Sequence, residues 1–142
     1  MDSWGYHLIL DVKGCDIEKA TNPDYIRDFT KELVKRIDMI PYGEPQVVHF
    51  ADNTDLAGWT VLQLIHTSNI TAHFCDINGD LYLDVFSCKE FDGDVVVQFL
   101  NDSFKPLRIT SRFLYRTAWN LNIGKSFLVG ILNASPYYQV SR

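Results

Sequence analysis

The sequence has little of what marks secreted, membrane or zinc-binding proteins. Its three cysteines are odd in number and lack C-x-x-C spacing, so neither a disulfide framework nor a zinc site is indicated. No stretch approaches the roughly 20 apolar residues that a transmembrane helix needs. The N-terminus, MDSWGYH, has no basic region followed by a long apolar run, so no signal peptide is indicated. We therefore expect a cytoplasmic protein with free thiols, no bound metal and no membrane partner.

Basic residues are scarce as well. Lysine and arginine number 13 against 18 aspartates and glutamates, a net charge of −5. Nucleic-acid-binding proteins concentrate basic side chains, so no nucleic-acid partner is expected. A hydrophobic content of 46% with 22% charged residues is typical of a folded globular protein. The length of 142 residues predicts one domain, spanning residues 1–142.

Hydrophobic periodicity predicts the elements of the fold. Strands are expected at residues 6–12, 46–50, 60–66, 70–75 and 81–86. An amphipathic helix should begin at Pro23, with Asn22 as its N-cap, and a second helix at Asp92-Gly93-Asp94. These elements predict an α+β fold, a two-layer sandwich of an antiparallel sheet with helices packed on one face.

Three stretches are less regular. Residues 40–45 contain two prolines and are expected to be a connector. Residues 107–115 alternate weakly and fit either a strand or a helix. The segment from Thr117 onwards is too apolar for a free tail, so it should pack on the body of the protein or on a partner.

The chain is organised around residues 67–88, TSNITAHFCDINGDLYLDVFSC. Two alternating runs flank Asn78-Gly79, a strong hairpin signal because both residues tolerate positive φ. In such a hairpin Ser68 and Cys88 come to the same end, and His73 projects between them. Each residue alone would more often be structural, but a serine, a histidine and a thiol together form a candidate reactive cluster.

This spacing resembles that of the pyruvoyl-dependent S-adenosylmethionine decarboxylases of the short prokaryotic type. Gly5, His7, Asp11, Gly14 and Cys15 in the opening GYHLILDVKGCD, and the segments VVHF and AGWTV, fit the same pattern. The resemblance covers roughly residues 4–100. It implies a small four-stranded αβ unit that forms a homodimer with active sites between protomers. His7, Asp11 and Cys15 are interpreted as structural, and His49, although in pattern, has no assigned role.

The resemblance implies a self-processing proenzyme. Ser68 would attack the carbonyl of Thr67, His73 would act as base in the elimination that follows, and Thr60 would supply a hydroxyl where the family has serine. Ser68 would become a pyruvoyl group that forms a Schiff base with the substrate and accepts electrons as CO2 leaves. Cys88 would return a proton to the substrate's α-carbon. No metal is implied.

The chain departs from the family at two positions. Thr67 replaces a glutamate before the reactive serine, and Ile77 replaces a glutamate that holds the substrate's ribose hydroxyls. Asp76 should point to the opposite face of its strand, and Asp80 is a candidate substitute. Candidate substrate-binding residues are the aromatic side chains in or beside the matched motifs: Trp4, Tyr6, Trp59 and Phe74.

Three functions therefore remain open on the sequence. The first is decarboxylation of S-adenosylmethionine, which supplies the aminopropyl donor for spermidine. The second is pyruvoyl-dependent decarboxylation of another amino acid, favoured by the loss of the glutamate at Ile77. The third is an unprocessed, non-catalytic homologue that binds a ligand or a partner. Retention of Ser68, His73 and Cys88 together argues against the third.

Overall fold

The computed structural model describes residues 3–118 together with 138 and 139. Three helices occur in this part of the chain: α1 (Ile17–Ala20), α2 (Pro23–Arg36) and α3 (Gly93–Phe104). The strands within it are β1 (Gly5–Lys13), β2 (Pro41–Phe50), β3 (Gly58–Ile65), β4 (Ser68–Cys75), β5 (Leu81–Ser87), β6 (Arg108–Arg116) and the two-residue β7 (Tyr138–Gln139). None of the described helices is long and apolar enough to cross a membrane.

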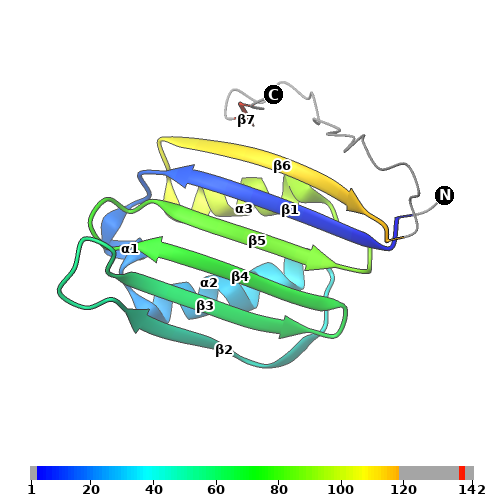
Figure 1. The fold of residues 1–142 in the computed structure, drawn as a ribbon, viewed down its shortest axis with the longest axis horizontal. Helices are drawn as coiled ribbons and strands as arrows, with labels where there is room; N and C mark the ends of the chain where they lie inside the picture. Colours follow the sequence, from blue (N-terminus) through cyan, green and yellow to red (C-terminus); the bar gives the residue numbers. More distant parts are fainter. Residues whose placement is uncertain (1–2, 119–137, 140–142) are drawn as a thin grey trace.

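The described strands form one sheet, in the order β2-β3-β4-β5-β1-β6-β7. Neighbouring strands are antiparallel except for the parallel pair of β6 and β7. Helices α2 and α3 lie on one face of this sheet (Figure 1). We call the opposite face the open face. The predicted two-layer α+β sandwich is therefore confirmed, although the sheet has more than the four strands that the resemblance implied.

Both main helices begin where the sequence predicted. The side chain of Asn22 accepts hydrogen bonds from the backbone N–H groups of Asp24 and Tyr25, each at 3.1 Å, and Pro23 occupies the first turn. Asp92 caps α3 in the same way through the N–H of Asp94, at 2.9 Å. Each cap satisfies donors that the first turn of a helix leaves unpaired.

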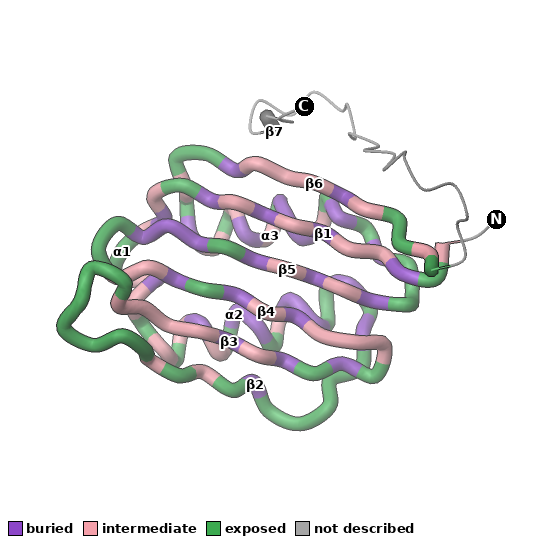
Figure 2. The backbone as a smooth tube through the Cα atoms, in the orientation of Figure 1, coloured by how far each residue is buried: buried purple, intermediate pink, exposed green. Residues whose placement is uncertain are grey.

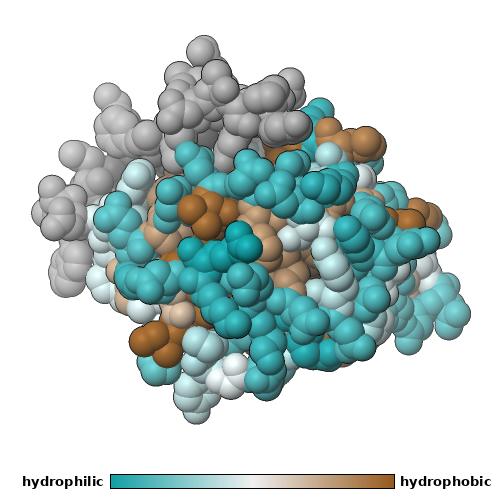
Figure 3. All heavy atoms as spheres, turned by 180° about the vertical axis from the view of Figure 1, so that it is seen from behind, coloured by the Kyte–Doolittle hydropathy of each residue, from teal (hydrophilic) through white to brown (hydrophobic). Residues whose placement is uncertain are grey.

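The core lies between the sheet and the helices. Buried positions alternate along the strands, as Figure 2 shows for the central strands β4, β5 and β1. Phe74 of β4 packs against Phe104 of α3, which packs in turn against Phe29 of α2. Seen from the helix side, the surface is mostly hydrophilic with isolated apolar side chains (Figure 3). Neither α2 nor α3 covers the open face of the sheet.

The prediction of a connector at residues 40–45 was wrong. Strand β2 begins at Pro41, and its pairing with β3 shifts register between Tyr42 and Gln46. Proline removes a backbone donor, which a central strand cannot tolerate but an outer strand can. Among the described strands β2 lies at the outer end of the sheet, and this position explains why the two prolines did not prevent a strand.

The ambiguous stretch at 107–115 is a strand. β6 pairs with β1 from Arg108 to Arg116, and Ile109 and Phe113 are buried toward the helices. The predicted packing of the apolar tail concerns residues that lie, apart from 117–118 and 138–139, outside the described part of the chain.

Candidate active site

The central hairpin forms as predicted. β4 and β5 pair in register from Ser68–Ser87 to Phe74–Leu81. Gly79 has φ of +68°, and a Cβ there would lie 2.6 Å from the carbonyl oxygen of Cys15, so glycine is required on both conformational and steric grounds. The turn places the two ends of the 67–88 stretch side by side at the opposite end of the hairpin.

Thr67, Ser68 and Cys88 meet at that end. The backbone N–H of Cys88 donates a hydrogen bond of 2.9 Å to the carbonyl oxygen of Thr67. This is the carbonyl that the hydroxyl of Ser68 would attack. Attack on a carbonyl builds negative charge on its oxygen, and a backbone donor already in place there stabilises that charge.

The backbone of Ser68 is strained. Its φ is +150°, a region that residues with side chains rarely occupy. Such a conformation costs about 1–3 kcal/mol and persists only where the surroundings enforce it. Here it falls on the residue whose N–C bond the proposed chemistry would break.

Thr60 and His73 form a second group. They face each other across β3 and β4 on the open face, with Thr60 Oγ1 3.1 Å from His73 Nδ1. His73 lies five positions after Ser68 along β4, or about 16 Å at about 3.3 Å per residue. One protomer thus brings Ser68 and Cys88 together but keeps His73 apart from them, unlike the single cluster expected from the sequence.

Of the four aromatic candidates, one lies in the core, two pack against it, and one is exposed. Phe74 is 1% exposed and belongs to the core, so its predicted role in substrate binding was wrong. Trp59 packs edge-on against His49, and Tyr6 packs against Tyr115 beside the core cluster. Trp4 is 62% exposed and remains the most accessible of the four.

Trp4 borders a cavity of about 450 Å³ that is also lined by Phe86, Arg116, Thr117 and Ala118. The ring centroids of Trp4 and Phe86 lie 6.3 Å apart, and the guanidinium of Arg116 lies 4.9 Å from the centroid of Phe86. Phe86 precedes Ser87, the register partner of Ser68. The sequence interpretation missed Phe86 and Arg116; the position of Phe86 two residues before Cys88 was the signal available for one of them.

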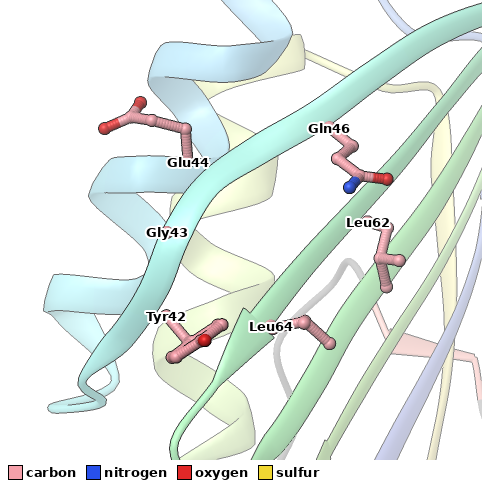
Figure 4. Close-up of a pocket in the computed structure, with 6 residues that line it drawn as sticks. All are labelled: Tyr42, Gly43, Glu44, Gln46, Leu62 and Leu64. Atoms are coloured by element: carbon pink, nitrogen blue, oxygen red, sulfur yellow. The ribbon is translucent and has the colours of Figure 1, made fainter.

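A second hollow lies at the β2 edge. Tyr42, Gly43, Gln46, Leu62 and Leu64 line a cavity of about 260 Å³ beside the irregular part of β2 (Figure 4). Glu44, also at its rim, points away and pairs with Lys31 of α2 at 2.8 Å. None of the predicted site residues lines this hollow, which we regard as a consequence of the register shift.

Neither neighbouring carboxylate is positioned to replace the missing glutamate. Ile77 is 66% exposed. Asp80 is 8% exposed, and it holds the backbone N–H of Gly14 at 2.9 Å and the ammonium of Lys13 at 3.1 Å. It thus fastens the turn to the end of β1, and the expectation that it could substitute was wrong. Asp76 is bound to His49, on the helix-facing side of the sheet.

His49 joins two segments through both ring nitrogens. Its Nε2 lies 2.6 Å from a carboxylate oxygen of Asp76, and its Nδ1 is bonded to Asp52 in the β2–β3 loop. These bonds, first that to Asp76, raise the pKa of His49 above its ordinary value. The residue without an assigned role is therefore a structural tie between the loop and the β4–β5 turn.

His7 and Asp11 each take part in a cross-strand pair on the open face. His7 Nε2 lies 2.9 Å from Asp84 Oδ1, and Asp11 Oδ2 accepts from Arg112 at 3.2 Å. These contacts fit the structural role expected for both residues.

The three cysteines are unpaired and differ in accessibility. Burial, and secondarily Asp80, raises the pKa of the Cys15 thiol to about 12. Burial likewise raises the pKa of Cys75. Cys88 is exposed. Of the three thiols, Cys88 is therefore the most accessible to a substrate. The described residues contain no group of three His, Cys, Asp or Glu side chains arranged to hold a metal ion.

Comparison with known sequences identifies the family to which the chain is similar. Residues 6–117 match the sequence profile of the S-adenosylmethionine decarboxylase family. A Clostridium botulinum protein named S-adenosylmethionine decarboxylase proenzyme is 28% identical over 108 residues, covering 74% of this chain and 89% of that protein. A Pyrococcus furiosus protein of the same name is 29% identical over 106 residues, covering 74% and 73% of the two chains.

A solved structure has the same fold. The crystal structure of the adenosylmethionine decarboxylase from Aquifex aeolicus superposes with a TM-score of 0.70 at 20% sequence identity. The match covers 88% of this chain and 100% of the other.

Proposed function

Because the chain belongs to the S-adenosylmethionine decarboxylase family, we propose that it is a proenzyme that cleaves itself between Thr67 and Ser68 and then decarboxylates S-adenosylmethionine. The observation that carries the proposal is the hydrogen bond from the N–H of Cys88 to the carbonyl oxygen of Thr67, next to a strained Ser68. A donor at the scissile carbonyl and backbone strain at the residue that follows the scissile bond both favour self-cleavage.

Self-cleavage begins with an acyl shift. The hydroxyl oxygen of Ser68 attacks the carbonyl carbon of Thr67, the C–N bond breaks, and the proton of the hydroxyl passes to the nitrogen of Ser68. The product is an ester between Thr67 and Ser68. The N–H of Cys88 stabilises the charge that builds on the Thr67 oxygen during attack.

Elimination follows and needs a base. His73 removes the α-proton of Ser68, and the carboxylate of Thr67 leaves as the C–O bond breaks. Thr60, 3.1 Å from His73 Nδ1, orients the imidazole. Hydrolysis of the remaining dehydroalanine releases ammonia and leaves a pyruvoyl group at position 68. The fragments contain residues 1–67 and 68–142.

The pyruvoyl group supplies an electron-accepting carbonyl for the loss of CO2, with no metal required. Around it the chain provides the exposed thiol of Cys88, which stands beside Ser68 and returns a proton to the substrate's α-carbon. It is the most accessible thiol of the three, which suits it to that role.

We infer a homodimer in which each site combines two protomers. His73 acts on Ser68, yet about 16 Å separates them within one chain. A second copy packed on the open face with two-fold symmetry can bring its own Thr60 and His73 to Ser68. Exposed apolar side chains on that face, Val48, Leu64 and Tyr82, favour its burial.

The cavity beside Trp4 suits part of the substrate. S-adenosylmethionine carries a sulfonium cation and an adenine ring, and both are held by aromatic faces. Trp4 and Phe86 offer such faces next to the register partner of Ser68.

Ile77 favours a second candidate. A carboxylate that accepts ribose hydroxyls is missing there, and Asp76 and Asp80 are both engaged elsewhere. A pyruvoyl-dependent decarboxylase of a simpler amino acid would need no ribose contact. We keep this as the alternative substrate class for the same reaction.

Decarboxylated S-adenosylmethionine is the aminopropyl donor for spermidine, and we assign the protein to that synthesis. The three unpaired cysteines support a reducing, cytoplasmic location. All strands that the structure describes belong to one sheet, which supports treating residues 1–142 as one domain.

Two measurements test the proposal. Intact-mass analysis of the purified protein should show two fragments, the second beginning with a pyruvoyl group. A carbon dioxide release assay should then show turnover of S-adenosylmethionine, with ornithine, arginine and lysine as competing candidates. One species at 16.3 kDa with unmodified Ser68 after long incubation would reject the proposal. Release from a simpler amino acid alone would select the second candidate.

A further inference from the structure

We propose that Ser87 is a positioning residue for self-cleavage, acting through the side chain of Thr67 to hold the Thr67–Ser68 bond in a reactive geometry. This inference rests on the proposed function. It adds one residue, Ser87, and one contact, its hydrogen bond to the side chain of Thr67.

Thr67 is held through both its side chain and its backbone. The hydroxyl of Ser87 donates to Thr67 Oγ1 at 2.9 Å, and Thr67 Oγ1 donates to Met39 Sδ at 3.2 Å. The carbonyl oxygen of Thr67 accepts from the N–H of Cys88 at 2.9 Å. With the side chain fixed on one side and the carbonyl on the other, Thr67 has little freedom to rotate the carbonyl away from Ser68.

Ser87 is itself fixed. It is fully buried, and its oxygen accepts a hydrogen bond of 2.9 Å from the N–H of Lys89. The ammonium of Lys89 donates to the carbonyl and the carboxylate of Asp38, at 2.5 and 2.6 Å. Cys88 lies between these two anchored residues, so the N–H that it offers to Thr67 has a set direction.

The contact explains how the strain at Ser68 is maintained. Ser68 is the first residue of the β4 ladder and directly follows Thr67, which Ser87 and Cys88 hold. Loss of the hydroxyl pair would let Thr67 turn, relax the φ of Ser68 and draw the carbonyl away from the attacking oxygen. Small displacements of reacting atoms have large effects on rate. The affected step is the acyl shift, because elimination depends on His73.

The threonine is therefore a functional replacement for the family's glutamate. Thr67 Oγ1 fits between a buried hydroxyl and a thioether. A glutamate at this position would bring a carboxylate against Met39, which cannot donate a hydrogen bond to it. We expect Thr67→Glu to slow self-cleavage in this chain.

The experiment separates the two chemical steps. Purified proenzymes are incubated with and without hydroxylamine, and the fragments are identified by intact mass. Hydroxylamine cleaves an ester and leaves a hydroxamate on Thr67 with an unmodified serine at position 68. Spontaneous processing leaves a pyruvoyl group instead. His73→Ala, which blocks elimination, serves as the reference for an accumulated ester.

For Ser87→Ala and Thr67→Val we expect self-cleavage at least about tenfold slower than wild type, with little hydroxylamine cleavage. Ser87→Thr and Thr67→Ser keep the hydroxyls and should restore most of the rate. Ser103→Ala is the matched control: it removes a serine hydroxyl that bonds the carbonyl of Phe99 within α3, at 2.7 Å, and should cleave at the wild-type rate. Thermal unfolding establishes that each variant is folded.

The outcomes are distinct. Wild-type rates in both folded Ser87→Ala and Thr67→Val would overturn the inference and leave the proposed function standing. So would accumulation of a hydroxylamine-labile ester in Ser87→Ala, because the acyl shift would then be intact. Absence of both cleavage and ester in the wild type would overturn the proposed function, and the inference with it.

Discussion

Thr60 Oγ1 and His73 Nδ1 lie 3.1 Å apart across β3 and β4, on the face of the sheet that carries no helix. The pair is preformed in the unprocessed chain, about 16 Å along β4 from Ser68, the residue on which we propose that His73 acts. At this distance His73 cannot reach Ser68 of its own chain. The proposed reaction therefore requires the homodimer, and this requirement can be tested directly.

Co-expression of Ser68→Ala and His73→Ala chains should restore cleavage that neither variant shows alone. In a mixed dimer one site combines Ser68 of one chain with His73 of the other, so the His73→Ala chain is cleaved. Separately, Ser68→Ala should not cleave because it lacks the attacking hydroxyl, and His73→Ala should be slower than wild type by about 10²-fold or more, the usual contribution of a positioned base. Mass spectrometry with one chain isotope-labelled identifies which chain is cut. A double variant carrying both substitutions, co-expressed with His73→Ala, is the control that should stay intact, because neither chain supplies His73. No cleavage in the mixture of folded Ser68→Ala and His73→Ala chains would contradict the shared site, and cleavage of His73→Ala by itself at the wild-type rate would contradict its role as the base.

Ile77→Glu should improve turnover of S-adenosylmethionine, chiefly through KM. Ile77 is exposed, so a glutamate there costs little to accommodate. One charge-assisted hydrogen bond to a ribose hydroxyl is worth about 1.5–3 kcal/mol, which corresponds to a KM lowered about tenfold or more. The assay is carbon dioxide release over a range of substrate concentrations, with Ile77→Gln as the uncharged comparison. Unchanged KM in Ile77→Glu would mean that the substrate does not approach this position.

The tie made by His49 should weaken as pH rises. Its bonds to Asp76 and Asp52 raise its pKa in the folded state above the value of about 6.5 expected for the unfolded chain. The stabilisation is therefore complete below the unfolded pKa and is lost as pH rises through the folded pKa. Thermal unfolding of the wild type, measured between about pH 5 and pH 9, should show this loss of stability as the pH rises from the unfolded pKa through the folded pKa of His49. His49→Gln, measured over the same range, should show a smaller dependence; identical profiles for the two proteins would refute the assignment.

Gly79→Ala should destabilise the fold by about 2 kcal/mol or more, because it combines an unfavourable φ with a steric clash. Its Cβ would lie 2.6 Å from the carbonyl oxygen of Cys15. Gly43 is the matched comparison, since its φ is +70° and nothing lies within 4 Å of a Cβ built there. Gly43→Ala should therefore cost only about 1 kcal/mol. Denaturant unfolding of the two variants measures both values. Equal losses of stability would show that the clash between the new Cβ and the carbonyl oxygen of Cys15 contributes nothing to the destabilisation.

The parts of the fold that depend on local signals could be predicted from the sequence. Asn22 and Asp92 cap helices because their side chains bond N–H groups two or three residues onward, and alternation in the hairpin reports burial on one face. The second half of β2 was predicted as a strand at residues 46–50, but its first half could not be, because tolerance of Pro41 and Pro45 depends on the place of the strand in the sheet. Sequence order does not give that place.

For the site, spacing brought Ser68 and Cys88 together correctly, since a hairpin returns the chain to its starting end. Spacing did not give the distance to His73, because residues close in sequence on one strand lie far apart in an extended conformation. Phe74 was wrongly proposed for substrate binding for a related reason: its neighbours on the motif alternate between the two faces, and it belongs to the buried set.

Strand β2 has a consequence for how the protein avoids aggregation. An outer strand offers unpaired donors and acceptors to any other chain with a free edge, and such contacts propagate into fibres. Pro41 and Pro45 remove two donors from β2, and the register shift between Tyr42 and Gln46 interrupts its regular spacing. A sheet blocked in this way cannot readily grow by adding strands at β2. This leaves the open face, and not the β2 edge, for the homodimer proposed above.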